Sequence, residues 1–322
     1  MRILIVCSGT KNKLSPFIKE QINALRNDGI ELFLFQIKSK GVIGYIYSLK
    51  LLKKQIKNFK PDLIHAHYGL SGLLANLQRK ISVVTTYHGS DIHSGGLLLK
   101  LSRLSMKLSK YNIFVSNKLL ELANYQKKNA AVQACGVDFD KFMMLPKEAA
   151  RKQLGLDLSD KLVLFAGAFD NEIKNPELAQ QACKLLPECK LIELKGYRRE
   201  EVNLLMNACD CLLMTSHREA SPMVIKEVMM CGTPVVSVDV GDVKDVLGET
   251  EGCFIVNRNA EEIASKLSDT IIFSAQKGKT SGRKRISELE LDNRQVAERI
   301  LDIYKDVSKH KRTLYDKICK SS

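Results

Sequence analysis

Two acidic residues, Glu219 and Glu227, are separated by seven residues and flank a predicted helix start. Ser221 is a favourable N-cap residue and Pro222 suits the first helical position, so the helix should begin near residue 221, after a predicted strand at 211–215. The first turn of such a helix offers unpaired N–H groups and a positive dipole end, which suit a diphosphate. Carboxylates placed there can accept hydrogen bonds from hexose and ribose hydroxyls. The spacing therefore predicts a clamp for a nucleotide sugar.

Spacing alone leaves a second interpretation open, in which Glu227 faces solvent and Glu219 is an ordinary loop acid. The neighbouring sequence favours the clamp. The two acids and the following Cys-Gly-Thr-Pro-Val-Val segment resemble the E-x7-E region of glycosyltransferase family 4, which contains retaining enzymes with the GT-B fold. Other matching segments cover the chain to about residue 260: Pro-Asp-Leu-Ile-His-Ala-His-Tyr-Gly at 61–69, Tyr-His-Gly-Ser-Asp-Ile at 87–92, Cys-Gly-Val-Asp-Phe-Asp at 135–140 and Val-Gly-Asp-Val at 240–243.

The resemblance implies roles for the residues of this region. Glu219 would contact the transferred hexose, and Glu227 would hold the ribose of the nucleotide. Other donor-binding residues would lie around them and in the loop after the first strand: Gly9, Arg218, Ala220, Ser221 and Pro222. Gly9 would allow the backbone to approach the diphosphate closely.

The family's phosphate-binding pair, an arginine and a lysine, is matched only in part. Lys174 corresponds to the lysine, and we expect it to be catalytic together with Glu219. Ala168 stands where the family has the arginine. Arg198, Arg199 and Arg218 are the candidates to supply the missing charge.

Three histidines lie at the ends of predicted strands in the first half. The resemblance implies that His88 reaches the donor sugar and the reacting centre. His65 and His67 lie on the same side of their strand, which would suit a metal pair, but no third ligand follows at suitable spacing. We therefore expect both histidines to have a structural role at the end of the strand, on the acceptor side of the site.

The resemblance implies transfer of a hexose from a UDP- or GDP-sugar to a lipid-linked or growing glycan acceptor in bacterial surface polysaccharide synthesis, with retention of configuration. No enzyme nucleophile is obvious, so positioning and charge stabilisation would carry the reaction. We expect no metal or other cofactor. The alternatives are a non-catalytic nucleotide-sugar-binding protein and a GT-B phosphorylase or epimerase. Nucleic-acid binding is disfavoured because no known module and no interleaved aromatic residues accompany the basic residues.

Short β-branched runs alternate with amphipathic stretches, which predicts an α/β fold with parallel sheets. The pattern restarts near residue 146, which predicts two Rossmann-like domains in series, with a cleft where they face each other. The family resemblance implies that these domains form the GT-B fold. The expected domains are an acceptor-side domain at 1–145, a donor domain at 146–295, and a helical tail at 296–322 that packs back on the first domain. Strands are expected at 2–6, 31–36, 62–66, 82–86, 112–115, 162–166, 190–194, 211–215, 234–238 and 253–256.

The net charge of +14 is unevenly distributed over the 322 residues. Residues 1–150 carry 23 Lys and Arg against 9 Asp and Glu, whereas residues 151–322 carry 27 of each kind. Such a one-sided excess predicts an anionic partner. Lys50, Lys53, Lys54 and Lys57 lie in an apolar helical pattern, which suits an anionic membrane surface. The alternative is an ordinary helix whose apolar residues pack on the sheet and whose lysines are only solvated.

The location of the protein is predicted from what the sequence lacks. No apolar run has the length of a membrane span, and no signal-peptide cleavage site follows the first residues. We therefore expect a cytoplasmic protein bound peripherally to the inner face of the cell membrane. The nine scattered cysteines predict reduced thiols rather than a zinc site.

Overall fold

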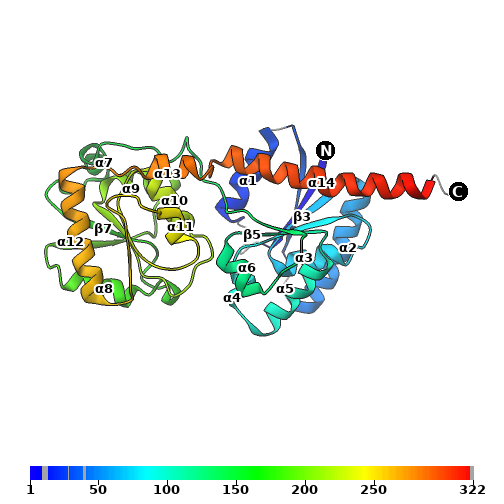
Figure 1. Ribbon diagram of the computed structural model, residues 1–322, viewed down its shortest axis with the longest axis horizontal. Helices are drawn as coiled ribbons and strands as arrows, with labels where there is room; N and C mark the ends of the chain where they lie inside the picture. Colours follow the sequence, from blue (N-terminus) through cyan, green and yellow to red (C-terminus); the bar gives the residue numbers. More distant parts are fainter. Residues whose placement is uncertain (9–13, 28, 39–40, 320–322) are drawn as a thin grey trace. The chain divides into compact units, whose positions relative to one another are not determined.

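The computed structural model describes residues 1–8, 14–27, 29–38 and 41–319 and divides into two compact units (Figure 1). Unit 1 comprises Met1–Gly136 and Asn293–Ser322, and unit 2 comprises Val137–Asp292. Each unit is a parallel sheet covered by helices, so the predicted α/β class is confirmed. Among the described residues, no helix is long and apolar enough to cross a bilayer.

The boundaries of the units differ from the expected 145/146 and 295/296. The backbone N–H of Val137 donates to the carbonyl of Leu291 at 2.8 Å, and Val137 also forms an isolated parallel bridge with Asp292. These contacts attach the start of the connecting loop to unit 2. The last helix begins at Asn293, so unit 1 resumes there.

Unit 1 contains a six-stranded parallel sheet in the order β2-β1-β3-β4-β5-β6. Its strands are β1 (Arg2–Ser8), β2 (Glu31–Ile37), β3 (Leu63–His67), β4 (Val83–Tyr87), β5 (Tyr111–Phe114) and β6 (Ala130–Val132). Its helices are α1 (Pro16–Asn27), α2 (Gly41–Phe59), α3 (Gly69–Asn76), α4 (Ser90–His93), α5 (Gly96–Leu108), α6 (Asn117–Ala123) and α14 (Asn293–Cys319).

Alternate residues of β1 enter two separate cores, as the period of two in a strand requires. Ile3 and Ile5 pack with residues of α1 and α14, whereas Leu4 and Val6 pack with residues of α2 and α3. In Figure 1, α14 runs beside α1 in the same unit. Strands β1, β3 and β4 are buried along most of their length, so they are visible in the sequence as largely uncharged runs, whereas the edge strands β2 and β6 are partly exposed.

Unit 2 contains a five-stranded parallel sheet in the order β11-β10-β9-β7-β8. Its strands are β7 (Lys161–Phe165), β8 (Cys189–Glu193), β9 (Cys211–Met214), β10 (Val235–Val238) and β11 (Phe254–Val256). Its helices are α7 (Lys147–Leu154), the 3-10 helix η1 (Glu172–Lys174), α8 (Pro176–Lys184), α9 (Arg199–Ala208), α10 (Met223–Met230), α11 (Val243–Leu247), α12 (Ala260–Gln276) and α13 (Gly282–Glu288). Because β7 and β9 are neighbours, the loops that follow them leave the sheet side by side.

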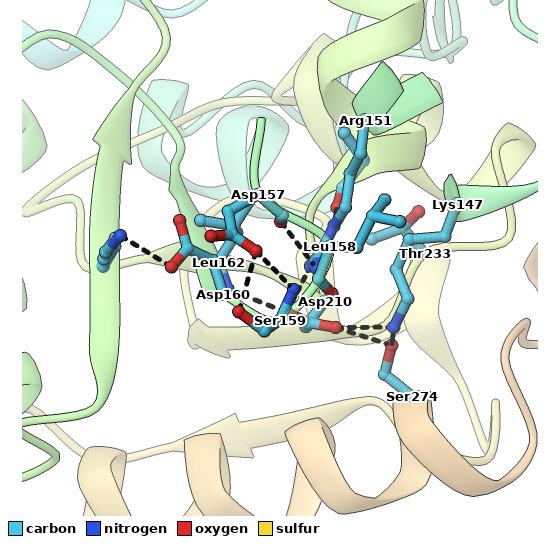
Figure 2. Close-up of polar contacts among 12 residues, drawn as sticks. Lys147, Arg151, Asp157, Leu158, Ser159, Asp160, Leu162, Asp210, Thr233 and Ser274 are labelled. Atoms are coloured by element: carbon cyan, nitrogen blue, oxygen red, sulfur yellow. Dashed lines mark hydrogen bonds and ion pairs between the residues drawn. The ribbon is translucent and has the colours of Figure 1, made fainter. Parts of the chain in front are cut away.

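A buried ionic network fixes the opposite, amino-terminal edge of this sheet (Figure 2). Oδ2 of Asp210 accepts hydrogen bonds from Nη2 of Arg151 at 2.9 Å and from the backbone N–H of Leu162 at 2.7 Å. Oδ1 of Asp210 accepts from Nζ of Lys147 at 2.6 Å. Lys147 and Arg151 belong to α7, so one carboxylate ties this helix to the starts of β7 and β9.

Candidate active site

Two of the predicted site residues meet at the carboxyl ends of β7 and β9. Nζ of Lys174 donates to Oε1 of Glu219 at 2.6 Å, and the two side chains are 23% and 17% exposed. Lys174 ends η1, and Glu219 lies in the loop between β9 and α10. The charged pair therefore occupies the edge of the sheet at which α/β proteins bind their ligands.

The backbone around Lys174 is held in place by its neighbours. Oγ1 of Thr215 donates to the carbonyl oxygens of Lys174 and Asn175, at 3.0 and 2.8 Å. A Cβ atom at Gly167 would lie 2.6 Å from Cγ of Lys174, so a glycine lets the aliphatic part of the lysine cross this loop. Ala168, at the position of the family's arginine, is half-buried next to this crossing.

Glu227 is buried on α10, with 5% of its surface exposed, so the interpretation of Glu227 as a solvent-facing residue is wrong. Nη2 of Arg199 donates to Oε1 of Glu227 at 2.6 Å, and the guanidinium carbon lies 4.7 Å from the centroid of the Phe142 ring. Among the three candidate arginines, Arg199 reaches an acid of the E-x7-E segment. Arg198 pairs with an acid three residues away, and Arg218 is exposed.

Ser221 does not cap α10, contrary to the sequence-based expectation. The helix begins at Met223 with Pro222 at the N-cap position, and Oγ of Ser221 is engaged elsewhere. It donates to Oδ2 of Asp242 at 2.5 Å and accepts from Nζ of Lys226 at 2.7 Å. Lys226 is completely buried, and its Nζ lies 3.8 Å from Oδ2 of Asp242. Burial raises the pKa of Asp242 above its ordinary value, although Lys226 and Ser221 oppose the shift.

This polar cluster joins the loop before α10 to the loop after β10. Gly241 adopts φ +55°, and a Cβ atom there would lie 2.6 Å from the carbonyl oxygen of Ala220. Glycine is therefore required for the close approach of the two loops. Ala220 and Pro222 are buried, so these two predicted donor-binding residues shape the loop rather than present side chains to solvent.

His88 follows β4 in unit 1 and belongs to a cluster of three histidines. Nε2 of His88 lies 3.0 Å from Nδ1 of His67, and the two rings stack with centroids 5.2 Å apart. His65 lies next to His67 and is hydrogen-bonded to the hydroxyls of Thr86 and Tyr304, at 2.7 and 2.5 Å. Burial lowers the pKa of His67 to about 3, and burial together with nearby His67 lowers the pKa of His88 well below its ordinary value. His88 is therefore a neutral hydrogen-bonding group at neutral pH.

His65 and His67 are both almost completely buried, and His67 holds the ring of His88 through its contact with Nε2. Asp91 is a further supporting residue that the spacing of the motifs did not single out. Its Oδ1 accepts from the backbone N–H of Gly89 at 2.9 Å, and its Oδ2 accepts from that of Gly69 at 3.0 Å. Burial raises the pKa of Asp91 to about 6, although these backbone hydrogen bonds oppose the shift. Asp91 thus links the loops that follow β3 and β4.

Gly9, the remaining predicted donor-binding residue, lies outside the described residues. Within the described part of the chain, no group of three or more His, Cys, Asp or Glu side chains is arranged to hold a metal ion. One Asp-x-Asp sequence is present at 138–140, and its geometry is that of a turn. Oδ1 of Asp138 accepts from the backbone N–H groups of Asp140 and Lys141, both at 3.1 Å, and Oδ2 lies 2.9 Å from Nζ of Lys141.

Solved structures share this two-unit fold. Sucrose-phosphate synthase from Thermosynechococcus elongatus matches with a TM-score of 0.74 and 16% identity, over 100% of this chain and 99% of that one. Alr3699/HepE from Anabaena, solved in complex with UDP, matches with a TM-score of 0.75 and 18% identity, over 95% of this chain and 100% of that one. The fold is therefore GT-B, the two-domain class of glycosyltransferases, as expected from the motifs.

Family models match both parts of the chain. The model described as glycosyl transferases group 1 covers residues 148–271, and the model described as glycosyl transferase 4-like covers residues 7–121. Together they span well over half of the sequence. The chain is therefore a glycosyltransferase with one domain of each kind, which confirms the resemblance.

Two relatives link the family to bacterial glycans. The putative teichuronic acid biosynthesis glycosyltransferase TuaC of Bacillus subtilis (strain 168) is 25% identical over 248 residues, which cover 68% of this chain and 63% of TuaC. N,N'-diacetylbacillosaminyl-diphospho-undecaprenol alpha-1,3-N-acetylgalactosaminyltransferase of Campylobacter jejuni is 22% identical over 90% of each chain. The chain thus spans less than two thirds of TuaC and most of the Campylobacter enzyme.

Proposed function

We propose that the protein transfers a hexose from a UDP- or GDP-sugar to a lipid-linked or glycan acceptor, with retention of configuration. The observation that carries this proposal is the Lys174–Glu219 pair at the carboxyl ends of β7 and β9, together with the burial of Glu227 on α10. A cation suits the diphosphate, and the two carboxylates suit the hydroxyls of the sugar and the ribose.

Donor binding would exchange the partners of these side chains. The diphosphate would take Nζ of Lys174 from Glu219, which then accepts hydrogen bonds from the hexose. The ribose hydroxyls would take Glu227 from Arg199. The released guanidinium would turn to the phosphates and supply the charge that Ala168 cannot.

In the proposed reaction, the bond between the anomeric carbon and the diphosphate oxygen breaks as the acceptor oxygen bonds to the same face of the hexose. The leaving diphosphate takes the proton of the acceptor hydroxyl, so the reaction needs no enzyme nucleophile. Lys174 and the first N–H groups of α10 stabilise the leaving group. Neutral His88 hydrogen-bonds to the hexose. With these groups in place, the reaction needs no divalent ion.

The acceptor side of the proposal is supported by the relatives and by the charge of unit 1. The Campylobacter enzyme is named for an acceptor linked to diphospho-undecaprenol, and TuaC for teichuronic acid biosynthesis. We place the present protein in the cytoplasm, at the inner face of the membrane, where its basic first half meets anionic lipid. Its product would enter a bacterial surface polysaccharide.

A donor screen tests the proposal. The protein is incubated with radiolabelled UDP- and GDP-sugars and a bacterial lipid extract, and label is followed in the organic phase, in polymer and in the nucleotide-sugar fraction. Label in lipid or glycan from one donor is expected, with an anomeric configuration by NMR that matches that of the donor. Label that stays on a nucleotide sugar of changed configuration would identify an epimerase. Binding without turnover of any donor would identify a binding protein.

A further inference from the structure

An apolar groove lies on unit 1 where helices α2, α3 and α5 meet. Its volume is about 450 Å³, within the roughly 300–1,000 Å³ that is usual for ligand sites. The lining consists of Leu and Ile side chains and one tyrosine; the residues used below are Tyr45, Ile46, Leu49, Leu73, Leu77 and Leu101. A site for a polar metabolite would carry several convergent polar groups. This lining favours a hydrocarbon ligand.

The apolar surface continues from the groove onto its rim. Ile46 and Leu77 line the groove and are 56% and 48% exposed. Leu97 and Leu104 of α5 are 71% and 44% exposed, and they stand four residues before and three residues after Leu101, which lines the groove. Residues at this spacing share one face of a helix. The exposed leucines therefore extend the groove into an apolar surface that is unfavourable to leave in water.

The helices that form this surface carry basic residues and no acids. The sequences of α2, α3 and α5 contain seven Lys and Arg residues and no Asp or Glu. On α2, the lysines at 50, 53 and 57 follow Ile46 at intervals of four, seven and eleven residues, so they continue the same helical stripe. All three are exposed, and none forms an ion pair with the described part of the chain. Their charge is available to an anionic partner.

We propose that this groove binds one hydrocarbon chain of a membrane lipid while Lys50, Lys53 and Lys57 meet the anionic headgroups around it. An apolar cavity with an apolar rim, on helices that carry basic residues and no acids, fits the boundary between acyl chains and anionic headgroups. This inference rests on the proposed function and extends its use of a lipid-linked acceptor. Within unit 1, α3 starts at Gly69, two residues after His67, and Gly69 is tied through Asp91 to the His88 loop. Within unit 1, the groove and the His88 loop are therefore linked through α3.

A single-tryptophan experiment tests where the lipid chain lies. The protein contains no tryptophan, so Leu77→Trp introduces a fluorophore at the groove rim without background fluorescence. Leu185→Trp, at an equally exposed position of unit 2, is the matched control. With phosphatidylglycerol vesicles whose acyl chains carry bromine, we expect strong quenching of the fluorophore at the groove rim and little quenching at the control position. Binding without quenching at the groove position would overturn the proposal.

Charge variants test the headgroup contacts. The combined change of Lys50, Lys53 and Lys57 to Gln should weaken binding to these vesicles on the order of 100-fold at low salt, because each lysine near an anionic surface contributes about fivefold. The control changes Lys152, Lys184 and Lys244 of unit 2 to Gln, which removes the same charge from exposed positions. High salt should weaken binding of the wild type. Equal loss in both triple variants, or equal binding to neutral phosphatidylcholine vesicles, would contradict the headgroup assignment.

Polar changes at the rim separate this inference from the proposed function. Ile46→Gln with Leu77→Gln should reduce vesicle binding at least tenfold, whereas Leu185→Gln with Ile272→Gln, of similar exposure, should not. Circular dichroism verifies that all variants fold. Hydrolysis of the donor in detergent-free solution, or transfer to a lipid-free acceptor, reports the donor site alone. Normal donor chemistry without vesicle binding would refute lipid binding in the groove but not the proposed transferase activity. Vesicle binding without donor chemistry would refute the transferase activity but not lipid binding in the groove.

Discussion

Lys174 and Glu219 lie 45 positions apart in the chain, yet Nζ of the lysine is 2.6 Å from Oε1 of the glutamate. Both side chains remain partly exposed, so a ligand can reach the pair without opening the core. The pair therefore suits a site in which a diphosphate replaces a carboxylate.

The two acids of the E-x7-E segment should have different kinetic effects. We expect Glu227→Gln chiefly to raise the KM for the donor and Glu219→Gln chiefly to lower kcat, because in the proposed function the first would contact the ribose and the second the hexose. Each loss should be tenfold or more, since a hydrogen bond to a charged group contributes about 1.5–3 kcal/mol. Glu261→Gln, which changes an exposed acid at the start of α12, is the control. Wild-type kinetics in both site variants would refute the assignment.

Arg199 should be the residue that compensates for Ala168. Arg199→Met is expected to weaken binding of the nucleoside diphosphate by tenfold or more, because it removes a charge-assisted contact that contributes about 1.5–3 kcal/mol. Arg198→Met, one residue earlier and paired with Glu201, should bind like the wild type. Calorimetric titration with UDP and GDP measures both. A larger loss in the Arg198 variant would reverse the roles.

Activity should persist in excess EDTA. Lys174 and the start of α10 carry the phosphate charge in the proposed mechanism, so a divalent ion has no required place. The measurement compares initial rates in untreated protein, in EDTA, and after addition of magnesium or manganese. Loss of activity on chelation with recovery on addition of either metal would require a revised donor site.

The histidine cluster should make unit 1 less stable in mild acid. The pKa of His67 is about 3 in the folded protein and about 6.5 in the unfolded chain, so below pH 6.5 the unfolded state binds the proton and the folded state does not. The free energy of unfolding should therefore fall as pH drops from 6.5, by about 1.4 kcal/mol per pH unit from this residue. Asp91, with a raised pKa of about 6, acts in the opposite direction between about pH 6 and 4.

Denaturant titrations from pH 8 to pH 5 isolate the contribution of His67. His67→Gln should show a shallower pH dependence than the wild type, whatever its absolute stability, because Asp91 is common to both chains. Parallel curves for the wild type and the His67 variant would show that this residue is not held neutral.

The network around Asp210 should be important for the stability of unit 2. Asp210→Asn leaves Arg151, whose side chain is 3% exposed, without its carboxylate, and breaking such a buried pair costs about 3–5 kcal/mol. Glu188→Gln removes the exposed ion pair with Lys161 and should change stability little. Thermal unfolding measures both variants. Equal melting temperatures would show that α7 is held by other contacts.

The strands were predictable from sequence because buried parallel strands are continuous runs of β-branched and aliphatic residues. β6 is the exception, since Ala130-Ala131-Val132 is short and carries no such pattern. The strand-end positions of Lys174, Glu219 and His88 followed from motifs that lie close together in the chain. Sequence spacing could show that these residues follow strands, but not which side chains they meet.

The partners that complete the site come from distant segments, and there the sequence was insufficient. Ser221 has the residue type of an N-cap, but Asp242 and Lys226 compete for its hydroxyl. The burial of Glu227 depends on the packing of α10, and its contact with Arg199 joins residues 28 positions apart. The supporting role of Asp91 could not be predicted, because its partners are backbone N–H groups, which almost every residue type can supply.

The position of α14 determines the order in which the chain can fold as it leaves the ribosome. Val296, Ala297, Ile300, Leu301 and Tyr304 of this helix complete the core that contains Ile3 and Ile5 of β1. Unit 2 is one uninterrupted segment, so its whole core is available before α14 has been synthesised. The unit that is made first must therefore wait, with one face of its sheet covered only by α1, until the last helix emerges. In this protein the second unit to be translated is the first that can finish folding.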